Sequence, residues 1–97
     1  MRVAIATDCN PGSSYTTNMA FCIAVAVRDL HFTPEQALQA ATLGGANALR
    51  VADVGHLAIG ARANLVTLDA PSHVHLAYRP GVPLVHDVFI DARKVSA

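Results

Sequence analysis

The residues best suited to chemistry lie near the start of the chain. An apolar segment ends at Asp8, and a turn of Asn10, Pro11, Gly12 and Ser13 follows at once. In α/β folds, ligands and catalytic groups collect at the carboxyl ends of strands. A carboxylate there can bind a metal ion or take a proton from water, and an amide beside a Pro-Gly turn suits a carboxylate or amide ligand. The plainer interpretation is a loop aspartate or helix cap followed by an Asx turn.

Histidines and cysteines are weaker candidates. If residues 73–78 are extended, His73 and His75 share one face, as zinc ligands can, but we favour the interpretation without a metal. Cys9 and Cys22 match neither a disulfide framework nor a zinc spacing, so both are expected as free thiols, with Cys22 buried. The remaining histidines have no partner spacing and are expected at the surface or at caps: His31, His56 and His86.

The first part of the chain is predicted to form one strand and one long helix before residue 31. The strand runs from Arg2 to Thr7, and its apolar content suits burial on both faces. A helix follows to about Leu30. Its centre, residues 20–27, is apolar all round, which predicts a helix that is wrapped on most sides. The candidate N-caps are four hydroxyl side chains: Ser13, Ser14, Thr16 and Thr17.

A second helix has the clearest local signal in the chain. Thr33 and Gln36 have the spacing of a capping box, and Pro34 stands at the first helical position. We expect this helix to continue through residue 41. Thr42 then caps or joins a further helix, with two glycines near its start.

Residues 51–97 carry the signals of a small sheet. Breakers separate its apolar runs, most clearly the Pro-Gly-Val-Pro run at 80–83, and Asp91-Ala92 forms the last turn. We therefore divide the chain into residues 1–50, one strand plus helices, and residues 51–97, strands of a small sheet. The predicted strands are Leu65–Leu68, Leu84–Ile90 and Lys94–Val95.

The composition is that of one small domain with a low fraction of charged residues. Of its 97 residues, 53% are hydrophobic and 14% charged, against about 25% charged in an ordinary domain. Broad apolar faces are therefore expected to contact a second copy in a homo-oligomer or the rest of a larger protein. The net charge is zero without a basic cluster, which argues against nucleic acid and anionic membranes.

The apolar runs are short. The longest, from Met19 to Val27, falls well below the ~20 residues of a membrane span. Near the N-terminus, Asp8 and Pro11 interrupt the apolar stretch too early for a signal peptide. These features predict a cytoplasmic protein.

Three stretches carry a resemblance to a known family. Their order and content resemble the C-terminal part of the amidohydrolase superfamily, and the Thr-Asp-x-Asn-Pro-Gly segment is similar to that of the imidazolonepropionase family within it. The stretches are Ala6-Thr-Asp-Cys-Asn-Pro-Gly-Ser-Ser14, Thr33-Pro-Glu-Gln-Ala-Leu38 with Ala41-Thr-Leu-Gly-Gly-Ala-Asn-Ala-Leu49, and Val54-Gly-His-Leu-Ala-Ile-Gly-Ala-Arg-Ala-Asn-Leu-Val66.

The resemblance implies an α/β fold, a fragment of a (β/α)₈ barrel, in which residues 1–50 supply the last strand and its helices. Strands of the flanking β-sandwich follow. It also implies that Asp8 ligates a Zn or Fe ion and assists proton transfer from the bound water. Asn10 and Gly12 would hold the open-chain product, N-formimino-L-glutamate, and Ser13 would contact the small-molecule substrate. The implied reaction is hydrolytic ring opening of 4-imidazolone-5-propanoate in histidine degradation.

The chain departs from the family pattern in two details and one absence. Asn64 stands where the family has Asp, and Asp91-Ala92 replaces an Asn/Asp-Gly turn. A closed barrel takes about 250 residues, and the other metal ligands, including a His-x-His pair on the first strand, are absent. We therefore expect the isolated chain to be inactive. The alternatives are a fragment of another amidohydrolase, such as a cyclic amidine or guanidine deaminase, and a non-catalytic oligomerising module.

Overall fold

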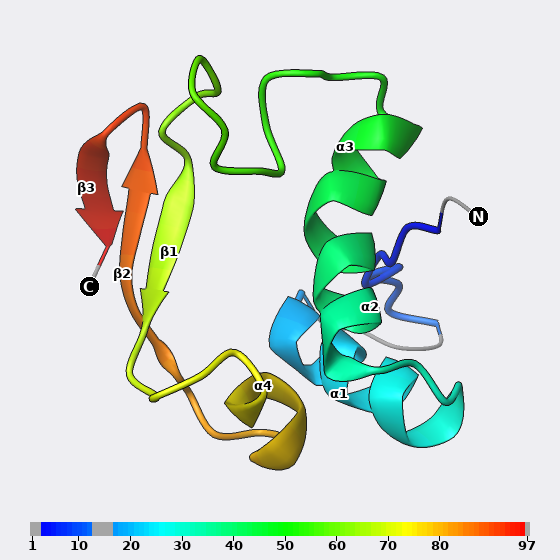
Figure 1. The fold of residues 1–97 in the computed structure, drawn as a ribbon. Helices are drawn as coiled ribbons and strands as arrows, with labels where there is room; N and C mark the ends of the chain where they lie inside the picture. Colours follow the sequence, from blue (N-terminus) through cyan, green and yellow to red (C-terminus); the bar gives the residue numbers. More distant parts are fainter. Residues whose placement is uncertain (1–2, 13–16, 97) are drawn as a thin grey trace.

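The computed structural model describes residues 3–12 and 17–96. In Figure 1 the helices lie on one side and a three-stranded sheet on the other, with a long connection above and a short helix below. The elements are α1 (Met19–Asp29), α2 (Pro34–Gln39), the π-helix η1 (Ala40–Gly44), α3 (Gly45–Ala48), β1 (Leu65–Leu68), α4 (His75–Tyr78), β2 (Val85–Ile90) and β3 (Arg93–Ser96).

The predicted N-terminal strand is wrong for the residues described. Residues 3–10 form no helix or strand, and Arg2 lies outside the described residues. A parallel strand needs neighbours that complete its hydrogen-bond ladder, and the described sheet consists of β1, β2 and β3 alone. Instead, the segment lies on a helix, where the Ile5 N–H donates to the Ala40 carbonyl oxygen at 3.1 Å.

Helix α1 ends where the sequence predicts, but its N-cap differs from the candidates. Asn18 caps it, since its side-chain oxygen accepts from the Phe21 N–H at 3.1 Å. Thr17 does not cap, and the other three candidates lie outside the described residues. Residues 20–27 are wrapped on most sides as expected, since all of them are buried or half-buried except Phe21, which is 47% exposed.

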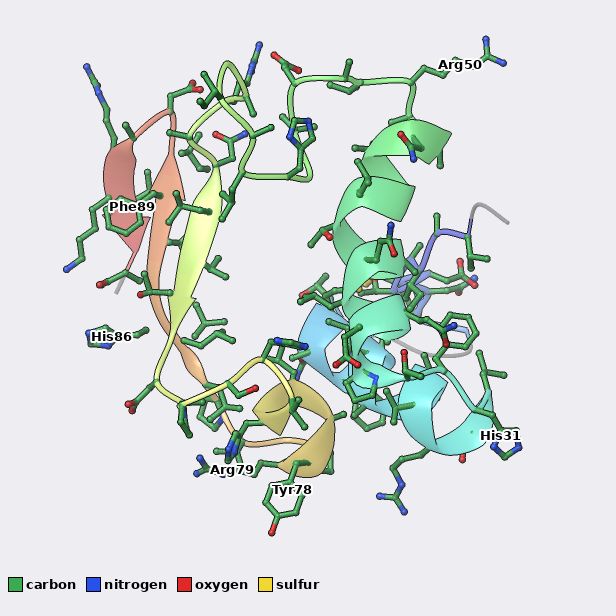
Figure 2. The ribbon with its side chains drawn as sticks, in the orientation of Figure 1. His31, Arg50, Tyr78, Arg79, His86 and Phe89 are labelled. Carbon is green, nitrogen blue, oxygen red and sulfur yellow. The ribbon has the colours of Figure 1, made fainter. Side chains whose placement is uncertain are left out.

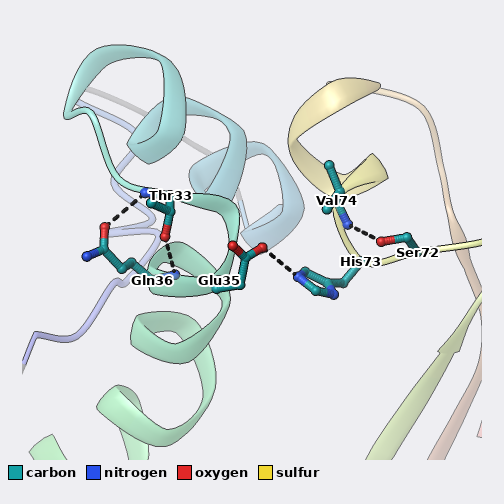
Figure 3. A network of polar contacts seen from close by, with 6 residues as sticks. All are labelled: Thr33, Glu35, Gln36, Ser72, His73 and Val74. Atoms are coloured by element: carbon teal, nitrogen blue, oxygen red, sulfur yellow. Dashed lines mark hydrogen bonds and ion pairs between the residues drawn. The ribbon is translucent and has the colours of Figure 1, made fainter.

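The second helical region confirms the capping box. Gln36 Oε1 accepts from the Thr33 N–H at 2.9 Å, and Thr33 Oγ1 accepts from the Gln36 N–H at 3.1 Å (Figure 3). Helix then continues without a break through α2, η1 and α3. Thr42 joins the two helices, and its hydroxyl donates to the Leu38 carbonyl at 2.8 Å. The π turn between α2 and α3 was not predicted.

The sheet is antiparallel, with strand order β1-β2-β3. β1 is the strand predicted, and the other two match their predictions within a residue at each end. Asp91 and Ala92 form the β2–β3 turn, both at positive φ, 51° and 66°. The Asp91 N–H donates to Asn64 Oδ1 at 2.9 Å, so the two departures from the family pattern meet at this turn.

Residues 73–78 are not extended, because His73 and Val74 form a turn and α4 begins at His75. This short helix packs against α1 and closes the core. The buried hydrophobic residues of the described chain are mostly alanines: Ile23, Ala24, Ala26, Ala37, Ala40, Ala46, Leu76 and Leu84. Residues from both halves of the sequence thus share one small core. None of the described helices has the length and apolar content required to cross a bilayer.

Candidate functional site

Asp8 stands at the end of the N-terminal segment, exposed to solvent, with a backbone φ of 49°. Aspartate is among the few residues that adopt this left-handed conformation readily. The segment before it is held by the Ile5–Ala40 hydrogen bond, and the Ile5 side chain packs against the core. Asp8 therefore follows a short stretch of chain that is held at Ile5 against the helix and the core.

The turn after Asp8 is an Asx turn. Asn10 Oδ1 accepts from the Gly12 N–H at 2.8 Å, and a Cβ at Gly12 would lie 3.2 Å from the same oxygen. Both residues are exposed. The structure thus brings Asp8, Asn10 and Gly12 together in one exposed stretch, whereas Ser13 lies outside the described residues.

A complete metal site is not formed by the part of the chain that the structure describes. Residues 3–12 and 17–96 contain no group of three or more His, Cys, Asp or Glu side chains that could hold an ion. Asp8 is the one candidate ligand that the turn presents, which is too few for a site with three or four protein ligands. A metal held here would need ligands from outside these residues.

The His73-Val-His75 pair does not form a metal site. His73 Nε2 lies 3.1 Å from Glu35 Oε2, an ion pair when the ring is protonated, which links the segment before α4 to α2 (Figure 3). His75 instead packs edge-on against Tyr78, with ring centroids 5.6 Å apart. The helical turn directs residues two apart in different directions, so the shared face of an extended segment is lost.

The remaining histidines and cysteines have ordinary environments. Figure 2 shows His31 and His86 pointing away from the molecule. His56 is more engaged than predicted, since Nε2 lies 2.9 Å from the Ala52 carbonyl and Nδ1 accepts from the Ala58 N–H at 3.3 Å. Both cysteines are free; Cys9 is exposed and Cys22 is half-buried rather than buried.

Two hollows flank the N-terminal segment, and neither contains Asp8 or Asn10. One, of about 270 Å³, lies between Val3 and the α2–η1–α3 helix, and the other, of about 280 Å³, between Ile5 and α1. Phe21 and Cys22 line the second. The candidate site residues therefore lie on an open surface of this chain rather than in an enclosed pocket.

Comparison with known proteins defines the class. The pattern of the amidohydrolase family matches residues 1–95. The chain therefore belongs to the amidohydrolase family. Membership in this family implies a divalent metal.

Relatives of high identity carry the name imidazolonepropionase. The chain is 75% identical to that of Mycolicibacterium smegmatis over 83 residues, 86% of this chain and 21% of the relative. It is 67% identical to that of Rhodococcus jostii over 87 residues (90% and 21%) and 64% identical to that of Streptomyces avermitilis over 93 residues (96% and 22%). The chain thus spans about one fifth of the length of the curated relatives it matches.

Proposed function

We propose that this chain is the C-terminal part of an imidazolonepropionase. The whole enzyme would open the ring of 4-imidazolone-5-propanoate by hydrolysis to N-formimino-L-glutamate, a step of histidine degradation in the cytoplasm. The observation that carries the proposal is the identity of 62–75% to proteins of that name over most of this chain. The two alternatives, a cyclic amidine or guanidine deaminase and a non-catalytic module, have no such support.

In this proposal the chain supplies the last barrel strand, its helices and strands of the flanking sandwich. Residues 3–8 would gain strand neighbours from the rest of the barrel. Residues 3–8 belong to no helix and to no strand of the described sheet, which is consistent with that role. The exposed apolar side chains of α1 would be covered in the same way.

Asp8 would provide one carboxylate ligand to a Zn or Fe ion whose other ligands come from outside this chain. A bound ion of this kind lowers the pKa of its water towards neutrality. The Asp8 carboxylate is solvent-accessible and can take a proton from a neighbouring water. Asn10 and Gly12, held in their turn, would face the amide and carboxylate groups of the ligand, and Ser13 would complete that contact.

The test is a chimera. Residues 1–97 replace the matching segment of the Mycolicibacterium smegmatis relative, and ring opening of 4-imidazolone-5-propanoate is followed by its absorbance. We expect turnover by the chimera and none by the isolated chain, which holds one candidate ligand. An inactive chimera that folds would contradict the proposal, as would turnover by the isolated chain.

The role of Asp8 is tested in the same chimera. Asp8→Asn removes the charge and the proton acceptor, so kcat should fall by about 10²–10⁴-fold, with loss of bound metal measured by elemental analysis. Asp29→Asn, a matched change at the exposed end of α1, should leave both unchanged. Equal behaviour of the two variants would remove Asp8 from the site.

A further inference from the structure

The segment that carries Asp8 docks on a π turn. The Ile5 N–H donates to the carbonyl oxygen of Ala40, the first residue of η1, at 3.1 Å. Figure 1 shows the N-terminal segment, in blue, beside the continuous helix that contains this turn. A π turn widens the helix and changes which backbone groups pair, and such turns are frequent at functional sites. Here a carbonyl within it accepts a donor from outside the helix.

Gly44, at the other end of the π turn, determines how closely the segment approaches. A Cβ at this position would overlap the Val3 carbonyl oxygen, and would lie 3.0 Å from the carbonyl carbon of Val3 and 3.4 Å from Ala4 Cα. These are backbone atoms, which cannot rotate away as a flexible side chain can. Any side chain at Gly44 therefore moves the segment outward.

The next residue provides a natural comparison. Gly45 has the same helical conformation as Gly44, with φ and ψ within a few degrees. A Cβ at Gly45 meets no atom within 4 Å. The two glycines therefore differ in one respect that matters, the contact with the N-terminal segment.

We propose that Gly44 is a positioning residue for Asp8. Its missing side chain lets Val3 and Ile5 rest on η1, and this contact fixes the inner end of the segment. Three residues of extended chain from Ile5 reach at most about 10 Å, so the anchor limits where the Asp8 carboxylate can lie. The catalytic part of this inference rests on the proposed function, whereas the docking part is a property of this chain alone.

The docking is tested on the chain itself by amide hydrogen exchange. Gly44→Ala should raise the exchange rate of the Ile5 N–H by about tenfold or more, because its acceptor is displaced. Gly45→Ala should leave that rate unchanged, since Ala is the better helix former and meets open space. Equal Ile5 exchange rates in the two variants would overturn the docking.

The effect on Asp8 is tested in the chimera by kcat, KM and metal content. Gly44→Ala should lower kcat by about 10²-fold, the effect of a displacement near 1 Å, and lower metal content, with KM changed much less. Gly45→Ala should match the unmodified chimera in all three. An inactive unmodified chimera counts against the proposed function, whereas full activity and metal content in Gly44→Ala count against the positioning role.

A second variant covers the case in which Gly44→Ala fails to fold. In the isolated chain, where residues 3–8 have no strand neighbours among the residues described, Ile5→Pro removes the N–H that Ala40 accepts and leaves the helix untouched, so it should lower the Tm. Ala6→Pro places proline one residue further along, where the N–H makes no hydrogen bond among the residues described. If Ile5→Pro and Ala6→Pro change the Tm of the isolated chain alike, the hydrogen bond at Ile5 does not hold the segment on η1.

Discussion

At the scale of single residues, the candidate site depends on two local conformations. Asp8 has positive φ, and Asn10 holds the following turn through its side-chain oxygen. Strained or unusual backbone persists where surrounding structure determines it, and it is enriched at functional sites. The motif therefore specifies the shape of the turn as well as the groups that would touch a ligand.

Asn10 tests this local role. Asn10→Ala removes an exposed side-chain hydrogen bond, so the Gly12 N–H should exchange faster while overall stability changes by less than about 0.5 kcal/mol, as at exposed positions. Asn10→Asp keeps an oxygen acceptor and should retain the protection. Slow Gly12 exchange in Asn10→Ala would show that the turn forms without the side chain.

At the scale of elements, the β2–β3 hairpin explains the departures from the family pattern. Two-residue hairpin turns with positive φ at both positions match the twist of the strands, and glycine fits them best. Ala92 holds such a position with φ 66°. Its N–H donates to the Ala63 carbonyl at 3.0 Å, beside the Asn64–Asp91 bond. Residues 63 and 64 therefore support a turn whose second residue is strained.

Relief of this strain is measurable. Ala92→Gly should raise the free energy of unfolding by about 1 kcal/mol, because the left-handed conformation costs an L-residue about 1–2 kcal/mol. In a domain of this size that corresponds to a rise in Tm of about 4–8 °C.

Ala58→Gly is the matched control, in an exposed loop at a position without positive φ. There glycine increases the entropy of the unfolded chain, so stability should fall by about 0.4–1 kcal/mol. A lower Tm for Ala92→Gly would show that the turn does not strain Ala92.

At the scale of the whole molecule, the chain exposes more surface than its size requires. Its accessible area is 6944 Å², whereas a folded monomer of 10.2 kDa exposes roughly 5,300 Å². The excess of roughly 1,600 Å² on this one chain is about twice the roughly 800 Å² that each partner buries in a protein–protein interface of standard size. Large apolar side chains contribute to it, with Leu57 79% exposed and Ile59 fully exposed. Such a surface favours burial against a second copy of the chain or against the rest of a larger protein.

This excess predicts self-association of the isolated chain. Light scattering at micromolar concentration should give a dimer or higher oligomer. Because the net charge is zero and the contacts would be apolar, about 1 M salt, which shortens the Debye length to about 3 Å, should not dissociate it. A monomer under these conditions, or dissociation by salt, would contradict the prediction.

The sequence by itself determined the features that depend on neighbours along the chain. The capping box at Thr33 needs only Gln36, strand β1 needs only its apolar run and the breakers beside it, and the motif around Asp8 identifies the family. The candidate site could be predicted only as a set of residue types, Asp8, Asn10, Gly12 and Ser13. Its geometry depends on contacts that no local pattern encodes.

Tertiary structure decided the features that depend on a partner far away in the sequence. Residues 3–7 have the composition of a strand but form none, because hydrogen bonding in a strand requires a neighbouring strand. The contact of η1 with Val3 through Gly44 and the His73–Glu35 pair both join segments separated by tens of residues. Local propensity depends on residues that are close in the sequence. Strand pairing and close backbone contact depend on the distant segments that the fold brings next to each other.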